Sequence, residues 1–188
     1  MKIGFIGTGY IAKSVITGIL GSKLKINKIF ISQRNKKISN FLSKKSRKIV
    51  IINNNQEIIN KSNWVFLSIT PTVGNKILKD LKFKKNQTII SFISTIKMSQ
   101  LKKYIKVKAT IVRAIPLPPI SLKAGPVPIF PPNKNVKKFL KNTLAVAARK
   151  TPAFTNKIII CNIKVKIWDL IKLYFNLGQF PYLGAPQI

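Results

Sequence analysis

Hydrophobic positions along most of the chain change repeatedly between two spacings. Short continuous apolar runs, typical of parallel strands covered on both faces, alternate with segments whose apolar residues recur at helical spacing. We predict strands at residues 2–7, 28–32, 49–52, 64–69, 88–93 and 110–114. We predict helices at residues 12–20, 35–42, 56–61, 73–81 and 98–104. This alternation predicts βαβ units with right-handed crossovers, and therefore a single α/β domain with a doubly wound, mostly parallel sheet of the Rossmann type.

The pattern changes at a proline-rich segment, residues 116–132, where we expect an extended surface segment with little regular structure. Later apolar patterns suit a helix at 136–148, a strand at 157–162, a helix at 166–176 and an extended piece at 180–183. We therefore predict a dinucleotide-binding domain over residues 1–125. Residues 126–188 would be a proline-rich segment with a terminal helix and strand that complete the same domain or are appended to it.

The motif that carries chemistry lies where the first predicted strand meets the first predicted helix. The sequence FIGTGYIA places Gly7, Gly9 and Ala12 at the Gly-x-Gly-x-x-Ala spacing of dinucleotide-binding turns. Gly7 permits the tight turn, Gly9 lets the backbone approach a pyrophosphate, and Ala12 keeps the helix close to the strand. The N-terminus of the helix then presents free N–H groups to the phosphates. The alternative is a glycine turn that binds nothing.

The end of the second predicted strand distinguishes between the two nicotinamide cofactors. NAD-binding domains usually place an acid about 20 residues beyond the glycines, where it binds the ribose 2′-hydroxyl. Here that region reads Ser32, Gln33, Arg34, without an acid. A hydroxyl and a guanidinium, which binds phosphate bidentately, favour the 2′-phosphate of NADP(H). The alternative is a solvated loop in a lysine-rich protein.

Several segments, taken in order, resemble the pyrroline-5-carboxylate reductase family. They are MKIGFIGTGYIAKSVITGIL, ISQR, NNQEII followed by WVFLSITP, IISFISTI and IVRAIPLPP. The resemblance implies NADPH as the cofactor and hydride transfer to the imine of 1-pyrroline-5-carboxylate, a cyclic imino acid of proline biosynthesis. The residues that it implies around the cofactor are Gly7, Gly9, Tyr10, Ile11, Ala12, Ser32, Arg34, Asn55, Ser68, Ile69, Thr70 and Pro71.

The chain departs from the family pattern near the expected position of the nicotinamide. Thr70 stands where the family has lysine, Ser94 and Thr95 where it has alanine and glycine, and Leu117 where an asparagine follows the proline. The family continues with a helical domain that forms the dimer and completes the substrate site, and no segment here matches it. The resemblance therefore implies a cofactor domain that is incomplete for catalysis, and it leaves a homo-oligomer open.

Composition provides few catalytic groups. The chain has no histidine, and none of its three acids is among the residues that the resemblance implies around the cofactor. Asp169 falls on the last predicted helix, where a capping or solvated role competes with a role as an acid. We therefore name no catalytic residue. With Cys161 as the one thiol and no imidazole, we expect neither a disulfide framework nor a metal site.

The charge raises a second function class. There are 35 basic and 3 acidic residues, a formal net charge of +32, which predicts non-specific binding of polyanions. The alternative function is thus a non-catalytic nucleotide- or nucleic-acid-binding protein on a Rossmann scaffold. However, the lysines are dispersed, and no basic stretch is interleaved with aromatic residues for base stacking. No apolar run approaches the ~20 residues that span a bilayer, so we expect a soluble, cytoplasmic protein without a membrane partner.

Overall fold

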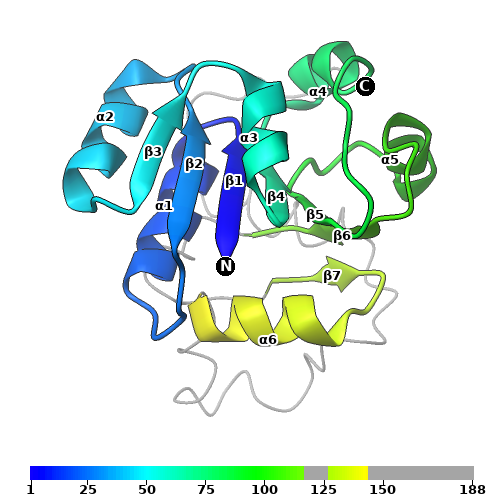
Figure 1. Ribbon diagram of the computed structural model, residues 1–188. Coiled ribbons are helices and arrows are strands. Elements are labelled where there is room, and N and C mark those ends of the chain that lie inside the picture. The colour runs from blue at the N-terminus through cyan, green and yellow to red at the C-terminus, as the bar shows by residue number, and fades with distance from the viewer. Residues whose placement is uncertain (117–126, 144–188) are drawn as a thin grey trace, which may run out of the picture.

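The computed structural model describes residues 1–116 and 127–143. Their strands form one seven-stranded sheet in the order β3-β2-β1-β4-β5-β6-β7 (Figure 1). The strands are β1 (Lys2–Ile6), β2 (Lys28–Ser32), β3 (Ile49–Ile52), β4 (Trp64–Leu67), β5 (Thr88–Ser91), β6 (Thr110–Ala114) and β7 (Ile129–Phe130). All neighbours from β3 to β6 pair in parallel, and β7 runs antiparallel to β6. The predicted α/β fold with a mostly parallel Rossmann-type sheet is confirmed.

Helices cover both faces of the sheet. They are α1 (Tyr10–Leu20), α2 (Lys36–Lys45), α3 (Asn55–Lys61), α4 (Pro71–Ile77), α5 (Met98–Tyr104) and α6 (Lys134–Thr143). Buried residues of α1, α2 and α6 belong to one hydrophobic cluster, and buried residues of α3 and α5 belong to the other. Helix α4 lies close to this second cluster at Gly74. None of the described helices is long and apolar enough to cross a membrane.

Strand β1 lies in the middle of the sheet because its side chains are apolar toward both layers. Ile3 and Phe5 belong to the cluster under α1, whereas Ile6 belongs to the opposite cluster. The Phe5 ring stacks on Phe66 of β4, with 4.6 Å between ring centroids. Phe139 of α6 packs against the same Phe66 ring at 5.8 Å. This aromatic contact fixes the centre of the sheet below the glycine turn.

Several elements differ from their predicted bounds, and two of them, β4 and α4, flank the site described below. Helix α4 starts at Pro71 and ends at Ile77, not at 73–81. Proline suits the first helical position because its fixed φ matches the helix and its missing N–H would have no partner there. Strand β4 ends at Leu67, since Ser68 turns toward β1 and its hydroxyl donates to the carbonyl oxygen of Gly7.

The proline-rich segment contains a strand that was not predicted. Within it, β7 pairs with β6, and Ile129 lies opposite Ala114. The following helix, α6, begins two residues before the predicted start, and its predicted continuation beyond 143 lies outside the described residues. The predicted elements after residue 150, together with Leu117, Cys161 and Asp169, also lie outside them. The division of the chain at residue 125 stays a prediction.

Candidate cofactor site

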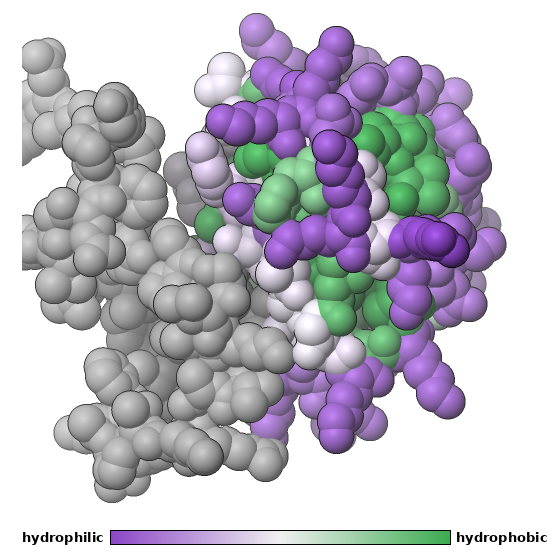
Figure 2. All heavy atoms as spheres, turned by 90° about the vertical axis from the view of Figure 1, so that its left-hand side faces the viewer, coloured by the Kyte–Doolittle hydropathy of each residue, from purple (hydrophilic) through white to green (hydrophobic). Residues whose placement is uncertain are grey.

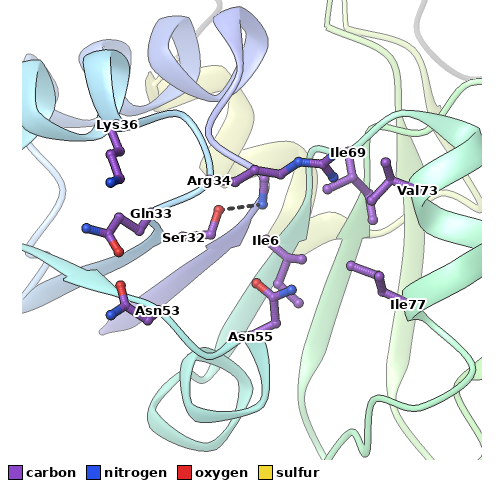
Figure 3. A pocket seen from close by; sticks show the side chains of 11 residues that line it. Ile6, Ser32, Gln33, Arg34, Lys36, Asn53, Asn55, Ile69, Val73 and Ile77 are labelled. Carbon is purple, nitrogen blue, oxygen red and sulfur yellow. Dashed lines mark hydrogen bonds between the residues drawn. The ribbon is translucent and has the colours of Figure 1, made fainter.

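The strand order places a crevice at the carboxyl ends of β1 and β4. Successive connections leave β1 toward β2 on one side, and the chain returns to β4 on the other, which is the topological switch point where ligands bind in open α/β sheets. A pocket of about 320 Å³ lies at this edge. It is lined by Ile6, Gly7, Ser32, Gln33, Arg34, Lys36, Asn53, Asn55, Ile69, Val73 and Ile77 (Figure 3).

Gly7 forms the turn at the end of β1, and only glycine fits there. Its φ is +93°, and a Cβ at this position would overlap the carbonyl oxygen of Ser68. The turn is held from both neighbouring strands. Gly7 N donates to Ser32 Oγ at 3.0 Å, and Gly7 O accepts from Ser68 Oγ at 2.6 Å. The loop geometry is therefore fixed by the ends of β2 and β4.

Gly9 is a glycine for a different reason. It is the N-cap of α1 with φ −88° and ψ −170°, an extended conformation that any residue adopts. A Cβ there would meet nothing within 4 Å. Neither backbone geometry nor packing requires glycine, so the missing side chain leaves open space above the N-terminus of α1. That space, beside first-turn N–H groups that no side chain caps, fits a phosphate.

Ser32 lines the pocket, but its hydroxyl is hydrogen-bonded within the protein. Its side chain is buried, with 4% of the residue exposed. Besides accepting from Gly7 N, its hydroxyl lies 3.0 Å from Thr8 Oγ1, and Thr8 Oγ1 also donates to Ser32 O. These bonds tie the end of β2 to the turn after β1. The predicted contact of this hydroxyl with a 2′-phosphate stays a prediction.

The exposed side of the pocket is basic. Arg34 and Lys36 are exposed and line it, and Figure 3 draws the Arg34 side chain reaching in the direction of Ile69 and Val73. The acids within the described residues are Glu57, which pairs with Lys61 at 2.6 Å, and Asp80. Neither lines the pocket, so no carboxylate there would repel a phosphate. The described residues contain no group of three His, Cys, Asp or Glu side chains that could hold a metal.

An apolar surface completes the pocket. Ile6, Ile69, Val73 and Ile77 line it with apolar side chains suited to a flat aromatic base.

Figure 2 looks onto the side of the molecule that carries α2, where hydrophilic side chains project over much of the described surface. On that side Phe41 lies between two cations, with Lys13 Nζ 4.4 Å and Lys45 Nζ 4.9 Å from the ring centroid. The positive charge thus continues from the pocket onto α1 and α2.

The structure brings part of the predicted site together around this pocket. The predicted residues that line it are Gly7, Ser32, Arg34, Asn55 and Ile69. Of the others, Gly9, Tyr10 and Ile11 lie at the start of α1. Ser68 and Thr70 lie between β4 and α4, and Pro71 is the first residue of α4. Ala12 is buried in the core below α1, as expected for a residue that sets the distance between helix and strand.

Six lining residues were not predicted. They are Ile6, Gln33, Lys36, Asn53, Val73 and Ile77. Lys36 is the one with a recognisable signal, because it is the next cation after Arg34 and begins α2. Nothing in the local sequence marks the α4 residues, since only the pairing of β1 with β4 brings them to the pocket.

The fold and the turn at Gly7 define a Rossmann-type dinucleotide-binding domain. Residues 2–95 match the family described as NADP oxidoreductase, coenzyme F420-dependent, and the chain belongs to that family. Pyrroline-5-carboxylate reductase 3 of Danio rerio is 28% identical over 128 residues, which are 66% of this chain and 44% of the relative. The chain thus spans less than half of that relative's length.

Solved structures share the fold. A 1-pyrroline-5-carboxylate reductase from Streptococcus pyogenes superposes with a TM-score of 0.63 at 24% identity, covering 77% of this chain and 56% of the other. A pyrroline carboxylate reductase from Plasmodium falciparum, solved with NADP bound, has a TM-score of 0.63 at 19% identity and covers 77% and 55%. The domain is therefore similar to the NADP-binding domain of pyrroline-5-carboxylate reductases.

Proposed function

We propose that this chain binds NADP(H) and is the cofactor-binding part of a cytoplasmic reductase acting on a cyclic imino acid such as 1-pyrroline-5-carboxylate, in proline biosynthesis. One observation carries the proposal. At the switch point, the open space above Gly9 adjoins an acid-free pocket with Arg34 and Lys36 at its exposed side. The family of the chain, and the relative solved with NADP bound, support the choice of cofactor.

In this proposal each part of the site binds one part of the cofactor. The pyrophosphate lies over Gly9, against the N-terminus of α1. The adenine packs on the apolar residues that follow β4, among them Ile69 and Val73. The 2′-phosphate is bound by Arg34 and Lys36, with a charge-assisted contact at the guanidinium. The full set of proposed cofactor-binding residues comprises the twelve that the resemblance implies, with Lys36 added.

The chemistry of the reaction would be hydride transfer, which the bound cofactor supplies. The chain's own residues bind it, fix its orientation and exclude water from one side. No described residue is assigned as a general acid. The chain spans less than half of its Danio rerio relative, and we propose that groups outside the described residues complete the substrate site. The chain alone should reduce 1-pyrroline-5-carboxylate far more slowly than the ~10 s⁻¹ of a typical enzyme.

Cofactor preference tests the proposal. We expect calorimetry to give a dissociation constant for NADPH about tenfold or more below that for NADH, because a charge-assisted contact contributes about 1.5–3 kcal/mol. Arg34→Ala should remove most of the difference. Arg47→Ala removes the same charge from an exposed arginine outside the pocket and should leave the preference unchanged. Equal dissociation constants for the two cofactors would overturn the proposal.

A second candidate function follows from the net charge of +32. On this alternative the chain binds polyanions, and NADPH is bound only as a small anion. Binding of a nucleic acid falls by orders of magnitude between about 50 and 200 mM salt when six or more phosphates are neutralised. NADPH bound by backbone N–H groups should lose much less affinity. Parallel titrations with NADPH and a short oligonucleotide distinguish the two functions, and equally steep salt dependence would favour the polyanion alternative.

A further inference from the structure

The carboxyl edge of the sheet continues beyond the pocket to β5 and β6, where Arg113 lies. Strand pairing places Leu67, Ser91 and Arg113 side by side on β4, β5 and β6. The half-buried guanidinium donates from Nη2 to the carbonyl oxygen of Ser94, in the turn after β5. One side of the planar fork is thereby fixed to this turn.

The Nε–H donor of the same guanidinium is unsatisfied. Arg113 Nε is buried and has no hydrogen-bond partner among the described residues. Leaving such a donor unpaired is costly, and the cost is larger for a charged group than for a neutral one. Buried unpaired donors are uncommon in native proteins, so the Nε–H requires an acceptor that the described part of the chain does not supply.

Nothing acidic within the described residues offsets the charge of Arg113. Glu57 pairs with Lys61 on α3, and Asp80 is exposed after α4. Burial lowers the pKa of the Arg113 guanidinium, because desolvation disfavours the charged form. Arginine remains charged even so. An anionic oxygen that accepts from Nε would satisfy the donor and balance the charge.

We propose that Arg113 binds the carboxylate of the small-molecule substrate, while the same guanidinium holds the turn at Ser94 in place. This inference rests on the proposed function, because that function supplies the substrate, a cyclic imino acid that carries a carboxylate. A planar guanidinium fork matches the two oxygens of a carboxylate. Arg113 thereby selects carboxylate-bearing imines over neutral ones.

The Nε–H of Arg113 can be observed directly by NMR on the full-length, ¹⁵N-labelled protein, with its signal assigned through bonds to the backbone. Cyclopentanecarboxylate serves as the probe, and the neutral cyclopentanecarboxamide is its isostere. At physiological salt we expect the carboxylate to shift the Arg113 Nε–H signal saturably, and the amide to bind about tenfold more weakly or not at all. Arg113→Lys should weaken carboxylate binding by about tenfold, since the fork is lost but the charge is kept.

Three results would overturn the inference. The first is no shift at Arg113 up to about 100 mM carboxylate, a concentration that detects even very weak binding. The second is a parallel shift at the exposed Arg47, which would mean general attraction of anions to a basic protein. The third is that NADPH alone saturates the shift, which would mean that the cofactor, and not the substrate carboxylate, supplies the acceptor for Arg113 Nε–H. NADPH binding is measured separately in the same samples, so a protein that binds the carboxylate at Arg113 but not NADPH would refute the proposed function and leave this site standing.

Discussion

The two halves of the carboxyl edge differ in how far their polar groups are satisfied. The adenosine side is our name for the turns after β1, β2, β3 and β4, where adenosine is proposed to bind. There Gly7 N and Gly7 O both have partners, and Thr8 and Ser32 bond to each other. The substrate side is our name for the turns after β5 and β6, where the substrate is proposed to bind. There Arg113 Nε has no partner among the described residues, and Ser94 and Thr95 are exposed. The adenosine side is preformed, whereas the substrate side presents one buried donor, Arg113 Nε, without a partner among the described residues.

This difference agrees with the extent of the similarity. The matched family residues end at 95, just past the turn after β5, and the chain spans less than half of its zebrafish relative. The adenosine side can be preorganised by one domain because its hydrogen bonds join the ends of strands in the same sheet.

The largest effect is expected from breaking the adenosine side at Gly7. Gly7→Ala forces a side chain into positive φ and against the Ser68 carbonyl, so the free energy of unfolding should fall by about 3 kcal/mol or more. Urea denaturation measures the loss. Gly9→Ala is the matched control, since its Cβ meets open space, and it should change stability by less than about 1 kcal/mol. Equal stability of the two variants would contradict the geometry of this turn.

A separate change at Gly9 should abolish binding without unfolding the protein. Gly9→Val fills the space above the N-terminus of α1, where the pyrophosphate is proposed to lie. We expect the NADPH dissociation constant to rise by about 100-fold or more, equivalent to roughly 2.7 kcal/mol. Calorimetry measures the affinity, and circular dichroism checks that the fold is retained. Normal NADPH binding by a folded variant would place the cofactor site elsewhere.

A pair of serines compares the two sides directly. Ser32→Ala removes the acceptor of Gly7 N and the contact with Thr8, and should lower the free energy of unfolding by about 1–3 kcal/mol, because a buried donor loses its partner. Ser94→Ala leaves intact the backbone carbonyl that Arg113 uses, and should stay within about 0.5 kcal/mol of the unchanged protein. Equal effects in denaturant would remove the contrast between a preformed and an open side.

The smallest effect concerns the charge that both sides share. With a net charge of +32, repulsion between like charges should destabilise the fold most at low ionic strength. The screening length is about 30 Å at 0.01 M salt and about 10 Å at 0.1 M, so added sodium chloride should raise the melting temperature by a few degrees. Calorimetric scans across this range measure the shift. A series of sucrose concentrations provides the uncharged control. A melting temperature that does not depend on salt would mean that the charges are too far apart for their repulsion to destabilise the fold.

Sequence patterns predicted the regular part of the molecule well. The bounds of β2, β3, β6 and α5 agree with the predicted ranges, because each is a clear apolar run or a helical repeat between polar turns. The Gly7 turn was predicted because the spacing of its glycines is a motif that can be recognised in the local sequence. Strand β7 was missed, since two residues among prolines have no periodicity, and only pairing with β6 makes them a strand.

The site was harder to predict than the fold because its contacts are long-range. Ser32 was predicted to contact a phosphate, which stays a prediction, but the bond of its hydroxyl to Gly7 N, 25 positions away, was not predicted. The α4 residues Val73 and Ile77 reach the pocket only through the pairing of β1 with β4. Arg113 was recognised as part of a segment, but its unpaired Nε depends on burial, which the order of residues does not encode.

The bond from Ser68 Oγ to Gly7 O also bears on the order of folding. The two residues are separated by 61 positions. Strand β4 can pair with β1 only after the two βα units between them have folded, or while those units still form an unfolded loop. Closing a loop of this length costs entropy that local contacts cannot offset early, so such pairings form slowly. The glycine turn, although short in sequence, therefore attains its final shape late in folding. In a refolding experiment, recovery of NADPH binding should lag behind recovery of helical signal.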